Sequence, residues 1–316
     1  MNKSDYKRAF DTIEPDAHLG QRIAQNLAGT RQPNSFGRKR TVILSVSVSL
    51  VVAACAWMLV IADFGGGSTP SVPPEQTVAD GSVFIPKIEL PKKTNAAMDM
   101  VGLFIYQGRI YTQTSSHISP EAAQAVLGEK VGRTKGNIDE WSSQKDYAKE
   151  LASSIGEQDI FTVKGYDSNF RLMTYQVADG QIWTEFYECL NGISISSGAD
   201  VLQKLNIIGN EQAVKWESFD SWNYDKKQYQ QVPLNETLQK FLEALNAAKP
   251  IEAKQLIDQG IYSEEGQSRK FLLFTLKDQS EVRLDLHQGG YVRYAPADVF
   301  FKLDDAAFTA VWEMLK

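Results

Sequence analysis

Residues 159–190, DIFTVKGYDSNFRLMTYQVADGQIWTEFYECL, decide the fold class of this chain. They contain three strand-like runs rich in β-branched and aromatic residues, and Asp179-Gly180 separates the second run from the third. A two-residue Asp-Gly connection is a strong hairpin signal, because a type I′ turn needs positive φ at both central positions. The stretch therefore predicts antiparallel strands joined by short turns.

The same pattern recurs on both sides of this stretch. Residues 102–114, GLFIYQGRIYTQT, predict two strands across Gln107-Gly108, and residues 270–296, KFLLFTLKDQSEVRLDLHQGGYVRYAP, predict strands around turns at 277–280 and 289–290. Residues 83–91, VFIPKIELP, predict an edge strand, because proline cannot donate to a ladder. Short connections favour meanders over βαβ units, so we expect an α+β fold of antiparallel sheets with packed helices.

Two helices are predicted from apolar residues at helical spacing. One lies between Pro233 and Pro250, and the other ends the chain after Asp304 and Asp305, which suit an N-cap and a first turn. The apolar residues are Leu234, Leu238, Phe241, Leu242 and Leu245 in the first helix, and Phe308, Val311, Trp312 and Leu315 in the second.

Residues 41–62 predict a transmembrane helix that precedes the sheets. The run has 22 residues without a charge, which as a helix would cover about 33 Å of a hydrocarbon core about 30 Å thick. Arg38, Lys39 and Arg40 precede it, and basic residues gather on the cytoplasmic side. We therefore expect a single-pass protein in the cell membrane, with a cytoplasmic segment 1–40, a Gly/Pro-rich linker 63–82 and an extracytoplasmic domain 83–316.

An alternative for the anchor is lipid attachment at Cys55. Residues 52–55, VAAC, resemble a bacterial lipobox. The site lies far from the N-terminus, however, and residues 56–62 continue the apolar run. We therefore interpret Cys55 as a small apolar helix residue. Cys189 is the only other cysteine, which excludes an internal disulfide in the exported domain and indicates a small core residue.

The charge is distributed unevenly along the chain. Residues 1–40 carry eight basic and four acidic residues, a net of +4, so that a whole-chain charge of −6 leaves −10 for the remainder. An acidic exported part argues against nucleic acid as a partner. The partners we expect are the lipid bilayer, a cell-wall ligand outside and a protein inside.

The cytoplasmic segment carries apolar residues at helical spacing, and 40 residues are too few to bury them internally. The candidate partner face comprises Phe10, Leu19, Ile23 and Leu27. Residues 6–23, YKRAFDTIEPDAHLGQRI, resemble the cytoplasmic heads of single-pass membrane proteins of Gram-positive bacteria, many of them uncharacterised and some similar to anti-sigma regulators. The resemblance implies a cytoplasmic partner such as a sigma factor, although the His/Cys zinc cluster of zinc-binding anti-sigma domains is missing.

Residues that could perform catalysis are scattered. His18, His117 and His287 are never spaced i, i+4, and the sequence holds neither a Gly-x-Ser-x-Gly elbow nor a phosphate-binding loop. His117 and His287 suit turn, surface or hairpin positions. We therefore predict no catalytic residue, no cofactor and no metal site, and expect no enzymatic activity.

One aromatic cluster is a candidate ligand site. Residues 216–233, WESFDSWNYDKKQYQQVP, include Trp216, Trp222 and Tyr224, which could stack on sugar rings of a cell wall. The spacing of three between Trp216, Phe219 and Trp222 equally suits a core patch. The same segment is where the domain would divide if it has two lobes, and one continuous domain is the alternative.

These patterns favour a single-pass membrane protein with a non-catalytic extracytoplasmic sensing or binding domain. The alternative is an anti-sigma-like regulator that binds a cytoplasmic partner through residues 1–30. A third reading, an enzyme acting on the cell wall, needs a carboxylate pair at a fixed separation, and the acidic residues provide no such pair.

Overall fold

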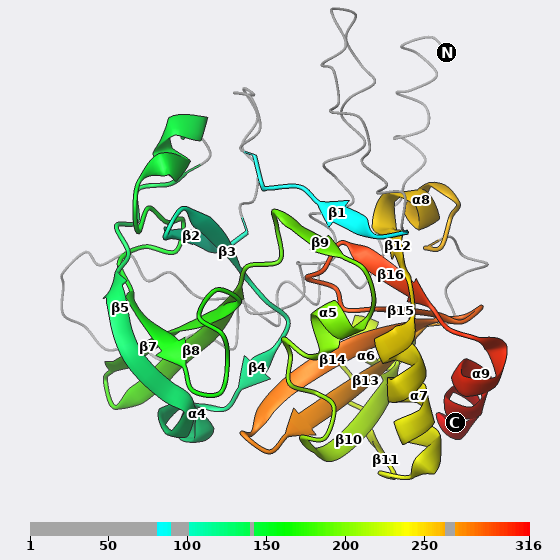
Figure 1. Ribbon diagram of the computed structural model, residues 1–316. Coiled ribbons are helices and arrows are strands. Elements are labelled where there is room, and N and C mark those ends of the chain that lie inside the picture. The colour runs from blue at the N-terminus through cyan, green and yellow to red at the C-terminus, as the bar shows by residue number, and fades with distance from the viewer. Residues whose placement is uncertain (1–80, 90–100, 140–141, 263–268) are drawn as a thin grey trace, which may run out of the picture. The chain divides into compact units, whose positions relative to one another are not determined.

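The computed structural model describes residues 81–89, 101–139, 142–262 and 269–316, and in them it shows an α+β fold with antiparallel sheets and few helices (Figure 1). The expected fold class is confirmed at this level. The predicted transmembrane helix and partner face lie outside the described residues. Within the described ranges, no helix is long and apolar enough to cross a membrane.

The predicted hairpins build a six-stranded sheet. Asp179 and Gly180 have φ of 52° and 76°, and Gln107 and Gly108 have φ of 50° and 69°, which is the positive φ that a type I′ turn requires. The strand order is β2-β3-β8-β7-β6-β5 with every pair antiparallel. The strands are β2 Leu103–Tyr106, β3 Arg109–Gln113, β5 Leu127–Arg133, β6 Asp159–Val163, β7 Arg171–Ala178 and β8 Gln181–Glu188.

A larger, eight-stranded sheet contains the C-terminal strands, in the order β11-β10-β13-β14-β15-β16-β12, with β4 paired to β14. Its strands are β4 His117–Ile118, β10 Glu211–Ser218, β11 Gln230–Val232, β12 Pro250–Glu252, β13 Arg269–Leu276, β14 Ser280–His287, β15 Tyr291–Arg293 and β16 Val299–Lys302. The predicted edge strand, β1 Val83–Ile85, has a single partner strand among the described residues, β9 Ile193–Ile195, as expected beside a proline.

Both predicted helices form, and the N-cap expected at Asp304 is confirmed. Asn235 accepts a hydrogen bond from the Leu238 amide at the start of α7 (Glu236–Ala247), and Asp304 accepts one from the Ala307 amide at the start of α9 (Asp305–Met314). Leu234 precedes α7 and is exposed, unlike the other predicted members of that face. The remaining helices are α4 Pro120–Val126, the 3₁₀ helix η2 Gln144–Ala148, α5 Ala199–Leu202, α6 Phe219–Asn223 and α8 Ala253–Asp258.

The main core lies between one face of the larger sheet and helices α7 and α9, which lie side by side in Figure 1. Alternate residues of the central strands enter it, because successive side chains of a strand point to opposite faces. Its central members are Trp216, Phe241, Leu245, Leu272, Phe274, Val282, Leu284, Leu286, Val292 and Val311. The intervening residues of each strand therefore point to the opposite face of the sheet.

The segment 216–233 forms one edge of the larger sheet. It contains the end of β10, helix α6 and strand β11. The chain passes from the smaller sheet to the larger one earlier, between Glu188 and Glu211. The β4 strand is the exception, because it comes from the N-terminal half and pairs with β14.

Candidate binding face on the larger sheet

The face of the larger sheet turned away from α7 carries arginines, aromatics and a histidine in register. Arg269 pairs with His287, and His287 with Tyr291. Directly paired residues of antiparallel strands project to the same face. The next row pairs Glu217, Phe271, Asp285, Arg293 and Phe300 across five strands, and a third row contains Leu273 and Arg283. We name this surface the arginine face.

Each arginine of this face packs against aromatic rings. The guanidinium carbon of Arg269 lies 4.0 Å from the ring centroid of Phe219 in α6 and 5.1 Å from that of Tyr262. Arg283 lies 5.0 Å from the Phe271 centroid and 5.4 Å from that of Trp222. Such contacts are attractive because the ring face carries negative charge density. The aromatics therefore hold the guanidinium groups in fixed positions.

Carboxylates neutralise only part of this charge. Arg283 Nε donates to Asp285 Oδ1 at 2.9 Å, and Lys215 Nζ lies 2.8 Å from Glu281 Oε2. Arg293 Nη2 lies 3.4 Å from Asp298 Oδ1, whose side chain is largely exposed. Arg269 forms no ion pair with any described carboxylate.

His287 is the most unusual residue of the arginine face. It is 1% exposed, and neither ring nitrogen has a hydrogen-bond partner among the described residues. Tyr262 and Phe300 flank its ring at centroid distances of 5.4 and 5.2 Å. Burial, with a smaller contribution from the nearby arginines, lowers the pKa of His287 to about 3. The strand position expected for His287 is confirmed, whereas a surface position is wrong, because its neighbours cover the ring.

The three aromatics proposed as ligand residues lie in different places. Trp222 is on the arginine face, 5.1 Å from Phe271 between ring centroids. Trp216 is 7% exposed and belongs to the main core on the other face. Tyr224 is 67% exposed. Sequence spacing did not bring the tryptophans together because β10 ends at Ser218 and the chain turns into α6 between them.

The other chemistry-bearing residues do not gather into a site. In the part of the chain that the structure describes, no group of three or more His, Cys, Asp or Glu side chains could hold a metal ion. His117 is exposed in β4, far along the sheet from His287, and Cys189 is a buried free thiol whose pKa is raised by burial. The core position expected for Cys189 is confirmed.

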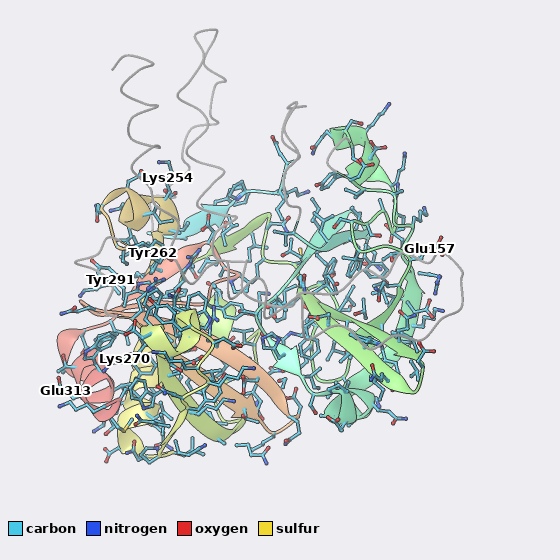
Figure 2. All side chains as sticks on the ribbon, turned by 180° about the vertical axis from the view of Figure 1, so that it is seen from behind. Glu157, Lys254, Tyr262, Lys270, Tyr291 and Glu313 are labelled. Carbon is cyan, nitrogen blue, oxygen red and sulfur yellow. The ribbon has the colours of Figure 1, made fainter. Side chains whose placement is uncertain are left out.

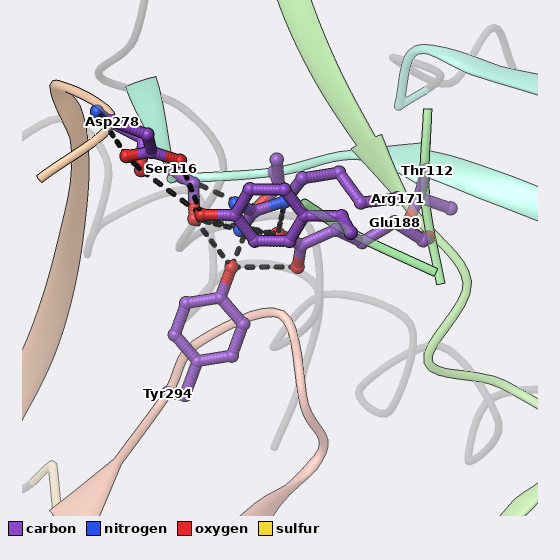
Figure 3. Close-up of polar contacts among 9 residues, drawn as sticks. Thr112, Ser116, Arg171, Glu188, Asp278 and Tyr294 are labelled. Carbon is purple, nitrogen blue, oxygen red and sulfur yellow. Dashed lines mark hydrogen bonds and ion pairs between the residues drawn. The ribbon is translucent and has the colours of Figure 1, made fainter. Parts of the chain in front are cut away.

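A second polar cluster joins the two sheets (Figure 3). Arg171 donates to Glu188 Oε1 from Nε at 3.1 Å and from Nη2 at 2.5 Å, and Tyr294 donates to Glu188 Oε2 at 2.7 Å. Ser116 lies 2.9 Å from the Tyr294 hydroxyl and accepts a bond from Arg171. All four residues are at most 1% exposed. This cluster is therefore a structural link, whereas Arg269, Arg283 and Trp222 of the arginine face are only half-buried and leave that face the better candidate for contact with other molecules.

Sequence reasoning missed the arginine face, although a signal for it exists. Arg283, Asp285 and His287 alternate with leucines in β14, which places all three on one face. Charged residues at period two in a strand usually indicate a solvated face. Here α6 and α8 cover the two ends of that face, which only the packing reveals. Comparisons of the chain with protein-family models, with curated proteins and with solved structures found no match.

Proposed function

We propose that this chain is a single-pass membrane protein with a non-catalytic extracytoplasmic domain that binds or senses a ligand through the arginine face. The observation that carries the proposal is the packing of Arg269, Arg283 and Arg293 against aromatic rings on one face of the larger sheet. Arg171 also packs against aromatic rings but is fully buried, whereas Arg269 and Arg283 of the arginine face are half-buried.

Composition supports a recognition role for this face. Tryptophan, tyrosine and arginine are the residues most enriched at binding hot spots, since they combine large contact area with directed hydrogen bonds. Trp222 and Tyr262 are half-buried, so both have surface left to contact a partner. The ring of Trp222 is backed by Phe271 and Phe219. A rigid, backed aromatic loses little conformational entropy when a ligand stacks on it.

The membrane context comes from the sequence. An anchor at 41–62 preceded by Arg38, Lys39 and Arg40 would place residues 83–316 outside the membrane. The linker 63–82 would hold the domain away from the bilayer. Cell-wall polymers carry sugars and acidic groups, so they suit both the extracytoplasmic location and the chemistry of the arginine face.

Sedimentation with peptidoglycan sacculi tests the proposal. The full chain, purified in detergent, should cosediment with sacculi, and Trp222→Ala should weaken the apparent affinity roughly tenfold or more. Trp183→Ala is the matched control, because Trp183 is a half-exposed tryptophan of β8 in the smaller sheet. Circular dichroism must show that both variants are folded. Failure of the wild type to sediment, or an equal loss in both variants, would refute the binding role.

A further inference from the structure

Three side chains of the arginine face converge on Tyr262. Arg293 Nη1 donates to the Tyr262 hydroxyl at 2.5 Å, and the Arg269 guanidinium lies 5.1 Å from the Tyr262 ring centroid. The rings of His287 and Tyr262 meet edge to face. Figure 2 shows Tyr262 and Tyr291 close together at this end of the larger sheet. We call Arg269, His287, Arg293 and Tyr262 the Tyr262 cluster.

The Tyr262 cluster has buried hydrogen-bonding capacity that the described residues leave unused. Nε of Arg269, Nε of Arg293 and both ring nitrogens of His287 are buried without a partner. Leaving one buried donor or acceptor without a partner is unfavourable, and more so for a charged group. Four such atoms within one cluster are far more than ordinary packing tolerates.

The cluster is also short of negative charge. Among the described residues, only the largely exposed Asp298 forms an ion pair with one of its two guanidinium groups, while Asp285, opposite Arg293, is shared with Arg283. Burial lowers the pKa of Arg269, as expected for a cation without a counter-ion. Buried cations in proteins are ordinarily paired.

Part of the Tyr262 cluster is exposed to solvent. Arg269, Tyr262 and Tyr291 are half-buried and therefore reach the surface, while Arg293 and His287 lie beneath them, 7% and 1% exposed. A group that contacts Arg269 and the Tyr262 hydroxyl would be adjacent to the deeper donors.

We propose that the Tyr262 cluster binds a carboxylate or phosphate group of an acidic ligand, with Arg269 and Arg293 as guanidinium clamps and His287 as a hydrogen-bond donor beneath them. The planar guanidinium group of arginine can donate two parallel hydrogen bonds to the paired oxygens of a carboxylate or a phosphate. A hydrogen bond between charged groups is roughly twice as strong as one between neutral groups. A neutral imidazole keeps one N–H to donate. This inference rests on the proposed function, since it names the ligand class that the arginine face recognises.

Calorimetric titration with inorganic phosphate and with acetate, at constant ionic strength in chloride, tests the site in the purified full chain. At least one of the two anions should bind saturably to the wild type. Arg269→Gln should weaken that binding about tenfold or more, because hydrogen bonds to charged groups are the strong ones. Arg269→Lys retains the positive charge but lacks the planar guanidinium group, so it should also bind the anion more weakly.

Arg133→Gln is the matched control. Arg133 is an exposed arginine of β5 in the smaller sheet, paired with Asp159 and Glu157, and its removal should leave anion binding unchanged. Tyr262→Phe serves as a second variant in case Arg269 variants do not fold, since it removes only the hydroxyl that holds Arg293. The proposed anion site would be refuted if neither anion bound saturably, or if Arg133→Gln weakened anion binding as much as Arg269→Gln.

The two proposals fail in different ways. If wild type cosediments with sacculi but neither phosphate nor Arg269→Gln affects that binding, the binding domain stands and the anion site is refuted. If phosphate or acetate binds and Arg269→Gln abolishes it while sacculi are not bound, the anion site stands and the wall-binding function is refuted.

Discussion

The hydroxyl of Tyr294 donates a 2.7 Å hydrogen bond to Oε2 of Glu188, joining residues 106 positions apart that belong to the ends of different sheets. Glu188 ends β8 of the smaller sheet, and Tyr294 follows β15 of the larger one. Arg171, paired with Glu188 across β7 and β8, supplies the opposite charge. One contact between the sheets is therefore a fully buried ion pair with a hydrogen-bonded tyrosine.

Tyr294→Phe should destabilise the fold by about 1–3 kcal/mol, because Glu188 Oε2 and the hydroxyls of Ser116 and Thr114 lose a buried partner. Urea unfolding followed by fluorescence measures the change. Tyr224→Phe, at an exposed tyrosine, should stay within about 0.5 kcal/mol of wild type. Equal stability of the two variants would contradict the role assigned to Tyr294.

Glu188→Gln should cost about 3–5 kcal/mol, because Arg171 then remains buried without a counter-charge. Replacing both partners by apolar residues, as in Arg171→Met with Glu188→Leu, should recover much of that loss, since no buried charge is left. Denaturant unfolding of the three variants gives the comparison. A double variant less stable than Glu188→Gln alone would show that the pair stabilises through more than its charges.

Stability should fall in acid partly through His287. Its pKa is about 3 in the folded chain, and its ordinary value is 6.5. The unfolded chain therefore binds the proton more readily, so the contribution of His287 is complete above pH 6.5 and is lost as the pH falls toward 3.

Through His287, the free energy of unfolding should fall by up to about 1.4 kcal/mol for each pH unit between pH 6.5 and the folded-state pKa of about 3. Unfolding free energies measured from pH 7 to pH 4 should decline less steeply in His287→Gln than in wild type. The comparison uses the slope, so a lower absolute stability of the variant does not affect it. Parallel curves, or an imidazole resonance of His287 that titrates near 6.5, would contradict the buried neutral state.

Membrane orientation is testable by labelling with an impermeant thiol reagent on intact cells. In a chain whose own cysteines are replaced by alanine, Gly67→Cys should react, whereas Asn34→Cys should react only after the cells are lysed. We expect this because basic residues, such as those at 38–40, gather on the cytoplasmic side of a membrane anchor. The reverse pattern would place residues 83–316 inside the cell and remove the cell wall from the ligands considered.

The alternative regulator function depends on the cytoplasmic segment. Ile23→Asp puts a charge in the middle of the predicted apolar stripe between Leu19 and Leu27, and it should weaken association with a cytosolic partner by about 10² or more. Crosslinking in membranes, with quantification of a copurified sigma factor, measures the effect. Gln21→Asp, off the stripe, should have no effect. If wild type and Ile23→Asp recover the same proteins, residues 1–30 carry no such partner face.

Local patterns in the sequence determined the hairpins and the two longest helices. The hairpins at 107–108 and 179–180 follow from residues that tolerate positive φ, and α7 and α9 begin at Asn235 and Asp304 because those side chains cap free backbone amides. These signals act within a few residues, so the antiparallel α+β class could be predicted before any long-range contact was known.

Only the tertiary structure decided which strands pair across long separations and which face each side chain meets. Trp216 and Trp222 lie six residues apart, yet one enters the main core and the other the arginine face, because the chain turns between them. Arg269, His287 and Arg293 come together through the register of three strands, and Glu188 meets Tyr294 through contact between sheets. Burial is a property of the whole packed molecule, so no local pattern could show that His287 would be enclosed and neutral between two arginines.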